Sequence, residues 1–517
     1  MARAGLWALA LGGLLVAGCA TRPGGTPPLP APVPVAVEPT PTAPPPMSRA
    51  AVLAAALDAE FSQPAFARAQ TALVVHSLAT GEMLYRRNGA TWLVPASTMK
   101  VLTSVAAAER LGWGYRFETR LYGTGPVVDG TLRGDLLVVG SGDPSINPRH
   151  PSRVDAFDAW ARRLKALGVR HIAGHVVGDD GAVEQPGWGI GWAWDDLIEG
   201  YGAAYGALQY HEGEVRITIG PGWTPGTPAV LYASPANHGL FLVNEAITAG
   251  ERSDGWLTLS RDPGTRFVTV TGRAPIGAAP RSAITSVANP TLFFVEELRA
   301  VLLRHGIVVD GAAADIDALS DRPRADEGWL LFVDESPPLV ELVDVTLKWS
   351  RNEYAEALLM ALDPEPPARA AESIPRLRET LERLGVDPGG YTTRDGSGLS
   401  RNDYLSADAL IETLRAAWAR PHLRDTLAAT LPEAGRSGSL ADRLRGTAAE
   451  GRVRAKTGSM SNVRSLAGYV ETAAGEPLVF AFLVNGFDVG AAAIDARVDA
   501  MLLAMVALAP AAPTPAP

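Results

Sequence analysis

The sequence predicts a mixed α/β (α+β) fold in which one domain is interrupted by a large, mostly-β insertion. Helical periodicity and strand-like apolar runs occur toward both ends of the chain, at 72–111 and at 339–508. The stretch between them, at about 117–326, instead contains many short β-type runs separated by Pro-Gly turns. This change of character indicates a region inserted into the surrounding domain.

The individual elements follow from local patterns. Two apolar runs around Thr80-Gly81, within 72–85, predict a hairpin, and a helix is expected from near Ser97 to a stop at Gly112. Further helices are expected at 292–303, 339–347, 354–362 and 494–508, and strands at 215–219, 257–259, 267–270, 453–456, 465–470 and 478–484. The main domain is therefore expected at 48–117 and 327–510, the insertion at 118–326 with room for two small domains, and a tail at 511–517.

Composition places the chain among globular proteins and excludes one class of partner. Of its 517 residues, 47% are hydrophobic and 20% are charged, which is enough for two or three cores. The formal net charge is −10, and no block of Lys and Arg could neutralise phosphates. Nucleic acid is therefore not an expected partner.

The first 19 residues are expected to be a lipoprotein signal peptide. Arg3 supplies positive charge, the apolar stretch 6–16 is too short to cross a bilayer, and Val16-Ala17-Gly18-Cys19 resembles the bacterial lipobox. Cys19 would carry a lipid that holds the protein in the periplasm, with the outer membrane favoured because no aspartate follows it. A plain secretory signal with an incidental cysteine is the alternative. Proline-rich 20–47 predicts a linker, and a single cysteine allows no intrachain disulfide.

Lysine is scarce, which makes each one informative. The chain has 46 basic residues, yet lysine occurs only at Lys100, Lys165, Lys348 and Lys456. Lysine can lose its proton near neutral pH and act as a base, whereas arginine cannot. The retained lysines therefore indicate places where a compact or deprotonable amine is needed.

Two of these lysines, Lys100 and Lys456, lie inside short motifs, and Lys348 lies beside a third. In Ser97-Thr98-Met99-Lys100, residues three apart on a helix share a face, so the Lys100 amine can reach the Ser97 hydroxyl. Ser350-Arg351-Asn352 offers a hydroxyl for proton relay and an amide for a substrate carbonyl. Lys456-Thr457-Gly458-Ser459 ends a strand that could pair with an extended peptide, where Gly458 would allow close approach of the substrate. Each motif alone also fits a polar cap or turn.

Together and in this order, the motifs match the set found in penicillin-binding proteins and class A β-lactamases. Four further sequence stretches narrow the match to one family within this set. They are Gly140-Ser141-Gly142-Asp143-Pro144-Ser145, Trp192-Ala193-Trp194-Asp195-Asp196, Asp395-Gly396-Ser397-Gly398-Leu399-Ser400 and Met460-Ser461-Asn462. From about residue 52 to 508 the chain resembles the D-alanyl-D-alanine carboxypeptidase/endopeptidases of the penicillin-binding protein 4 type, a low-molecular-mass class C family. This resemblance implies a β-lactamase/transpeptidase-like domain with an antiparallel sheet flanked by helices.

The resemblance also implies residue roles and partners. Ser97 would attack the D-Ala-D-Ala carbonyl of peptidoglycan stem peptides, and the lactam carbonyl of β-lactam antibiotics, with Lys100 as its base. Ser350 would pass a proton to the leaving amine and Asn352 would hold the substrate backbone. Lys456 and Thr457 would bind the terminal carboxylate, and the N–H groups of Ser97 and Ser459 would form the oxyanion hole. Arg351 departs from the family, which usually has aspartate there, and we expect altered local packing without loss of activity.

In relatives specific for diaminopimelate-type stem peptides, an aspartate of the inserted region meets the free ammonium of the substrate. Asp196 and Tyr201 are the candidates here, together with Met460 and Ser461 after the third motif. A capping aspartate among packed side chains is the alternative interpretation.

Other functions remain to be weighed against this one. A serine β-lactamase shares the three motifs, and a wall-binding lipoprotein without activity is a second alternative. No Gly-x-Ser-x-Gly elbow of the α/β-hydrolases, Walker A loop or His-Glu-x-x-His helix occurs, so neither cofactor nor metal is expected. The balance between carboxypeptidase and endopeptidase action, which differ only in the leaving group, is left open by the sequence.

Overall fold

The computed structural model describes residues 24–25, 47–184, 187–363 and 365–511. The chain divides into two units, Met1–Pro46 and Met47–Pro517, and the second unit contains every element described below. The predicted signal peptide, Cys19, almost all of the linker and the tail beyond 511 lie outside the described residues. Within the described ranges, we find no helix whose length and apolarity would let it cross a bilayer.

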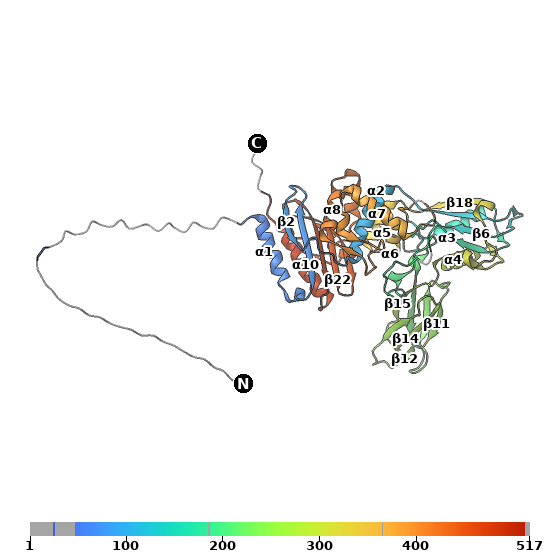
Figure 1. The fold of residues 1–517 in the computed structure, drawn as a ribbon. Helices are drawn as coiled ribbons and strands as arrows, with labels where there is room; N and C mark the ends of the chain where they lie inside the picture. The colour runs from blue at the N-terminus through green and yellow to red at the C-terminus, as the bar shows by residue number, and fades with distance from the viewer. Residues whose placement is uncertain (1–23, 26–46, 185–186, 364, 512–517) are drawn as a thin grey trace, which may run out of the picture. The chain divides into compact units, whose positions relative to one another are not determined.

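A five-stranded antiparallel sheet forms the centre of the main domain, in the order β2-β1-β23-β22-β21 (Figure 1). It joins the two ends of the chain, because the N-terminal hairpin pairs through β1 with a strand from near the C-terminus. The predicted hairpin and the three predicted C-terminal strands are confirmed. Their bounds are β1 (Gln70–Ser77), β2 (Met83–Arg87), β21 (Val453–Met460), β22 (Val463–Glu471) and β23 (Pro477–Asn485).

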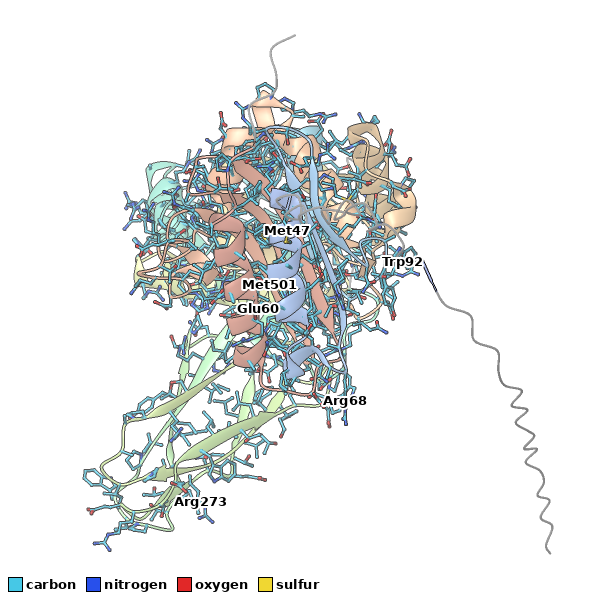
Figure 2. All side chains as sticks on the ribbon, turned by 90° about the vertical axis from the view of Figure 1, so that its left-hand side faces the viewer. Met47, Glu60, Arg68, Trp92, Arg273 and Met501 are labelled. Carbon is cyan, nitrogen blue, oxygen red and sulfur yellow. The ribbon has the colours of Figure 1, made fainter. Side chains whose placement is uncertain are left out.

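Alternation along the strands assigns each side chain to one of two helical layers. In β23, Phe480 and Phe482 pack against α1 (Arg49–Phe61) and α10 (Ala491–Val506), whereas Val479 and Ala481 face the opposite layer. Figure 2 shows α1 and α10 side by side, where Arg497 lies 3.3 Å from Glu60. The opposite layer contains α2 (Met99–Leu111), α5 (Leu339–Lys348), α6 (Asn352–Met360), α7 (Ala370–Leu384), α8 (Ala407–Trp418) and α9 (Pro421–Thr430).

The first and last stretches of the chain between α2 and α5 together form two small sheets. One has the order β17-β8-β6-β3-β18, and the other has the order β16-β7-β5-β4. Two helices pack with them in one hydrophobic cluster, which is centred on Trp160 and Phe294. The elements are β3 (Glu118–Gly123), β4 (Val127–Val128), β5 (Thr131–Leu132), β6 (Leu136–Val139), α3 (Ala156–Ala166), β7 (His171–Ile172), β8 (Val176–Asp179), α4 (Pro290–Arg304), β16 (Val308–Val309), β17 (Ala313–Asp315) and β18 (Trp329–Glu335).

A second part of the insertion is purely β-structured. Two short sheets pack around a separate core that includes Val215, Ile217, Val268 and Val270, and Figure 2 labels Arg273 on its long strand β14. The strands are β9 (Glu214–Gly220), β10 (Val230–Ser234), β11 (Phe241–Asn244), β12 (Ile247–Ala249), β13 (Trp256–Ser260), β14 (Phe267–Pro275) and β15 (Arg281–Ser286).

The domain boundaries stay a prediction, because residues Met47–Pro517 form one compact unit. Strand pairing nevertheless bears on the second boundary, predicted at 326/327. Strand β18 pairs with β3, with Glu335 opposite Glu118, so sheet membership would extend the insertion to Glu335. The insertion also holds α3, a helix that the sequence patterns did not indicate.

Candidate active site

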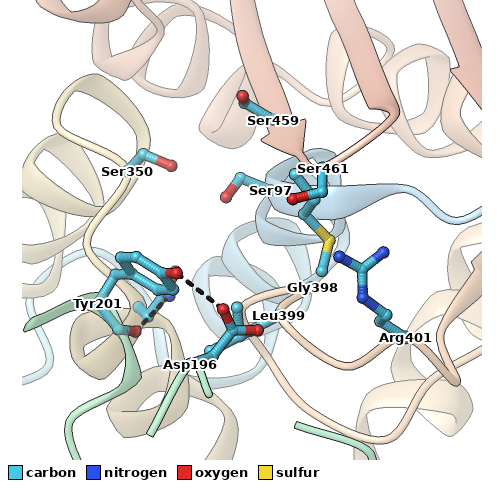
Figure 3. A pocket seen from close by; sticks show the side chains of 11 residues that line it. Ser97, Asp196, Tyr201, Ser350, Gly398, Leu399, Arg401, Ser459 and Ser461 are labelled. Atoms are coloured by element: carbon cyan, nitrogen blue, oxygen red, sulfur yellow. Dashed lines mark hydrogen bonds between the residues drawn. The ribbon is translucent and has the colours of Figure 1, made fainter. Parts of the chain in front are cut away.

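A cavity of about 330 Å³ lies where the sheet, the helical layer and the insertion meet. Figure 3 shows Ser97 near its centre, between Ser350 on one side and Arg401 on the other. The lining is Ser97, Asp196, Tyr201, Ser350, Asn352, Gly398, Leu399, Arg401, Ser459, Met460 and Ser461. Eight predicted site residues therefore meet in this one cavity, although they come from four distant stretches of the chain.

Ser97 lies on a tight turn rather than on the α-helix itself. The 3-10 turn Ala96–Thr98 precedes α2, so the hydroxyl sits just before the helix N-terminus, where the helix dipole favours negative charge. Two glycines, Gly398 and Gly458, pack closely against this turn. A Cβ at Gly398 would collide with the Ala96 carbonyl oxygen, and a Cβ at Gly458 would lie 2.8 Å from the Pro95 carbonyl oxygen and 3.1 Å from the Ser97 nitrogen. Gly458 is thus needed for packing against the turn, and the close approach of a substrate at this residue stays a prediction.

Lys100 forms a hydrogen bond with the Ser97 hydroxyl. Its Nζ donates to Ser97 Oγ at 3.0 Å, to Asn352 Oδ1 at 2.6 Å and to the Ser397 carbonyl oxygen at 2.8 Å. The side chain is fully buried, and this burial lowers the pKa of the amine to about 8, although nearby carboxylates oppose the shift. Lys100 can therefore be neutral, and act as a base, within the physiological range of pH.

Two buried carboxylates hold the loop that contacts Lys100. Glu356 accepts from the N–H groups of Gly396 and Ser397, each at 2.9 Å. Asp395 accepts from the Ser400 N–H at 2.7 Å and from Trp192 Nε1 at 2.8 Å, which ties the loop to the insertion. Burial and repulsion from Asp395 raise the pKa of Glu356 to about 8. The 395–400 stretch carries part of the family resemblance, but its sequence does not predict these contacts.

A second serine–lysine pair faces the first. Lys456 Nζ donates to Ser350 Oγ at 2.9 Å and to the Thr457 carbonyl oxygen at 2.6 Å. Lys456 is fully buried, and burial together with the charge of Lys100 holds its pKa well below the ordinary range. Ser350 has the left-handed backbone angle φ 59°, which is strained for a residue with a side chain. Lys456 is therefore placed to act on Ser350, and its amine lies behind the cavity surface.

Thr457 and Asn352 make defined contacts of their own. The Thr457 hydroxyl lies 2.7 Å from the Ser439 hydroxyl. Asn352 accepts from Lys100, while its Nδ2 donates to the Tyr201 carbonyl oxygen at 2.7 Å. The insertion therefore contacts the second motif directly.

The candidates for substrate recognition lie together in the lining of the cavity. The Tyr201 hydroxyl donates to Asp196 Oδ1 at 2.7 Å, and both side chains line the cavity with Met460 and Ser461 (Figure 3). Arg401 lies in the same lining, and its guanidinium makes no ion pair with any described residue. Arg401 was not among the predicted site residues, although it directly follows the 395–400 stretch of the family resemblance.

Arg351, which replaces the usual aspartate of the family, forms ion pairs with two glutamates of the insertion. Its Nη1 lies 3.0 Å from Glu212 and 3.3 Å from Glu214. Arg149 pairs with the same two carboxylates at 2.7 and 2.9 Å, and Asn147 donates to Glu212 at 2.7 Å. Two arginines thus neutralise two nearly buried glutamates directly behind Ser350 and Asn352.

Replacing Arg351 with aspartate is expected to destabilise the protein by about 2 kcal/mol. The new carboxylate would lie against Glu212 and Glu214 and would leave them with Arg149 alone. Urea unfolding of the Arg351→Asp variant measures the loss, and Arg351→Lys, which keeps the charge, is the control. Equal stability of Arg351→Asp and wild type would show that the ion pairs contribute nothing.

One group of carboxylates could hold a metal ion, but it lies outside this cavity. In the described part of the chain, ligand atoms of Asp180, Asp315 and Asp317 come within 4.8 Å of one another. Burial raises the pKa of Asp180 to about 6, and its carboxylate accepts from the Thr291 hydroxyl at 2.6 Å. Acidic groups of this kind are common without a metal, and none of the three belongs to the Ser97 site.

Comparison with known proteins agrees with the resemblance inferred from the motifs. Residues 53–507 match the D-Ala-D-Ala carboxypeptidase 3 (S13) family. A D-alanyl-D-alanine carboxypeptidase of Actinomadura sp. is 34% identical over 444 residues, which cover 83% of this chain and 80% of the relative. The D-alanyl-D-alanine carboxypeptidase DacB of Haemophilus influenzae is 27% identical and covers 84% of this chain and 92% of its own.

The fold is similar to that of a solved structure. The crystal structure of penicillin binding protein 4 from Haemophilus influenzae aligns with a TM-score of 0.75 at 24% identity, over 87% of this chain and 98% of that chain. The predicted fold class is thereby confirmed. Because the family match spans most of the sequence and a relative exceeds 30% identity over four fifths of its own length, this chain belongs to the D-Ala-D-Ala carboxypeptidase 3 (S13) family.

Proposed function

We propose that this protein is a serine-type D-Ala-D-Ala carboxypeptidase and endopeptidase that acts on peptidoglycan stem peptides and their cross-links through an acyl-enzyme at Ser97. The observation that carries the proposal is the fully buried Lys100 amine, 3.0 Å from Ser97 Oγ, in a cavity that also exposes Ser350 and Ser459. A nucleophile with a base of tuned pKa at hydrogen-bond distance is what acyl transfer requires.

Acylation begins when neutral Lys100 takes the Ser97 proton as Oγ attacks the carbonyl of the penultimate D-alanine. The N–H groups of Ser97 and Ser459 stabilise the negative oxygen that forms. As the peptide C–N bond breaks, Ser350 donates a proton to the leaving nitrogen. In total, one proton moves from Ser97 to the leaving amine, with Lys100 and Ser350 as carriers.

Two leaving groups fit the same chemistry. Free D-alanine leaves in the carboxypeptidase reaction, and the amine of a neighbouring stem leaves when a cross-link is cut. Thr457 contacts the terminal carboxylate, and Lys456 acts through Ser350, to which it donates at 2.9 Å. Water then hydrolyses the acyl-enzyme. A β-lactam acylates Ser97 in the same way, but its leaving amine stays attached to the acyl group.

The part of the cavity lined by Asp196 and Arg401 suits a side chain that carries both charges. Asp196, held by Tyr201, can accept an ammonium, and the Arg401 guanidinium can pair with a carboxylate. Diaminopimelate-type stem peptides present both groups at one end of a flexible chain, which Met460 can contact. Ser461 adds a hydroxyl at the same place.

Labelling with penicillin tests the mechanism. Mass spectrometry of the labelled protein is expected to find one adduct, on the peptide that contains Ser97. An adduct on another serine, or no adduct in folded protein, would refute the proposal. Digestion of purified muropeptides then separates tail trimming from cross-link cutting, and rapid, complete turnover of nitrocefin would instead favour a β-lactamase.

We further propose that Cys19 carries a lipid that anchors the protein in the periplasm, at the outer membrane. The proposal is supported by the sequence Val16-Ala17-Gly18-Cys19 alone. Membrane fractionation tests it: wild type is expected with the membranes and the Cys19→Ser variant in the soluble fraction. Wild type that is soluble after processing would contradict the anchor.

A further inference from the structure

A second hollow adjoins the active-site cavity and is larger. It measures about 690 Å³, against about 330 Å³ for the cavity around Ser97, and both lie within the size range of ligand sites. The two share Asp196, Tyr201 and Ser461. From these residues the hollow, which we call the side groove, extends along the insertion past Asp262, in the loop after β13, to Phe267 at the start of β14.

Strand β21 shows which side of the scissile bond the side groove serves. In the proposed binding mode the terminal carboxylate lies near Thr457, and the preceding substrate residues follow the strand toward Met460. The side groove begins at Ser461, just beyond that end of β21. It therefore lies on the acyl-donor side, away from the leaving group.

The side groove is acidic and its charge is not neutralised from within. Its carboxylates come from Asp195, Asp196, Glu199 and Asp262, and none of them forms an ion pair with a described residue. The only basic residue in the lining, Arg261, is 8% exposed and donates to the Ser286 carbonyl oxygen at 2.8 Å. The groove therefore favours a cationic ligand.

Aromatic side chains accompany these carboxylates. Trp194 is 72% exposed, and Phe267 is 60% exposed although its ring stacks on Phe241 at 5.2 Å. Because both rings line a groove beside a catalytic cavity, they can contact a further ligand. An aromatic ring next to a carboxylate suits an ammonium group on an aliphatic chain, because the ring contacts the methylene groups and attracts the charge.

We propose that the side groove binds a second stem peptide that is cross-linked to the acyl donor, with the free ammonium of its diamino acid among Asp195, Glu199 and Asp262. In such a substrate the donor's own side-chain amine is already an amide, formed with the D-alanyl carbonyl of the second stem. The nearest free ammonium then belongs to the second stem, which extends beyond Asp196. This inference rests on the proposed function and adds a preference for multiply cross-linked substrates.

The test compares two substrates and two matched variants of the full chain. The groove variant is Asp262→Asn with Phe267→Ala. The control variant, Asp254→Asn with Trp256→Ala, removes an exposed acid and an exposed aromatic from the same β-structured part but outside the groove. The substrates are a monomeric pentapeptide muropeptide and a cross-linked trimer, and kcat and KM are measured for each.

The groove variant is expected to raise KM for the trimer about tenfold with little change in kcat. KM for the monomer and the rate of penicillin acylation should stay at the wild-type level, as should all constants of the control variant. Raising the salt concentration should increase the trimer KM of wild type more than that of the groove variant, because salt screens the ammonium–carboxylate attraction.

Two results would overturn the inference. In one, the groove variant cleaves the trimer as wild type does, and in the other its monomer KM rises by the same factor. Wild type that cleaves monomers but not trimers would also exclude it. If wild type neither reacts with penicillin nor cleaves the monomer, the proposed function itself is contradicted. Failure of the inference and failure of the proposed function can therefore be told apart.

Discussion

The Ser97→Ala variant is expected to lose D-Ala-D-Ala cleavage by about 10⁶-fold and to take up no penicillin. Two serines of the cavity could be the nucleophile, because Ser350 also has a buried lysine beside it: Lys456 Nζ lies 2.9 Å from Ser350 Oγ. Ser97 has the geometry of the nucleophile: it precedes the N-terminus of α2 and lies 3.0 Å from an amine whose pKa is about 8. Ser350 has a strained backbone conformation and accepts a hydrogen bond from Lys456.

The matched control for this prediction is Ser350→Ala. It is expected to retain penicillin labelling on Ser97, at a reduced rate, because the attacking oxygen and its base remain. The two labelling rates and the labelled peptides, read by mass spectrometry, give the comparison. Undiminished labelling of Ser97→Ala with the adduct on Ser350 would reverse the two roles.

Replacement of Lys100 by arginine is expected to lower the rate of acylation by about 10³- to 10⁴-fold. Arginine keeps a positive charge but cannot give up its proton, so it cannot take the proton of Ser97. Lys100→Met, similar in length and without charge, should lose a similar factor. The second-order rate constant for penicillin acylation measures the effect, and a circular dichroism spectrum checks that each variant is folded.

The same argument predicts the pH dependence of wild type. Only neutral Lys100 can act as the base, and burial sets the pKa of its amine at about 8. Below that pH most of the amine is protonated, so the acylation rate should rise with pH and level off above about 8. A profile that is flat from pH 6 to 9, or Lys100→Arg with the wild-type rate, would exclude Lys100 as the base.

The sequence by itself determined the parts of this protein that depend on local order along the chain. Apolar periodicity located the hairpin at 72–85, the C-terminal strands and the helices at 339–347, 354–362 and 494–508, because period and breakers are properties of neighbouring residues. The three motifs and the scarcity of lysine singled out Ser97, Lys100, Ser350 and Lys456. Helices α1, α3, α7, α8 and α9 were not predicted, and α7 carries Pro375 within a helix that packing stabilises.

Only the tertiary structure decided which groups act on one another across the chain. The pKa of Lys100 depends on its complete burial and on Glu356 and Asp395, which approach from other elements. The ion pairs of Arg351 with Glu212 and Glu214, and the place of Arg401 in the cavity, likewise required contacts between distant segments. Electrostatic energies and steric fit vary over a few ångströms in space, and spacing along a sequence does not specify such distances.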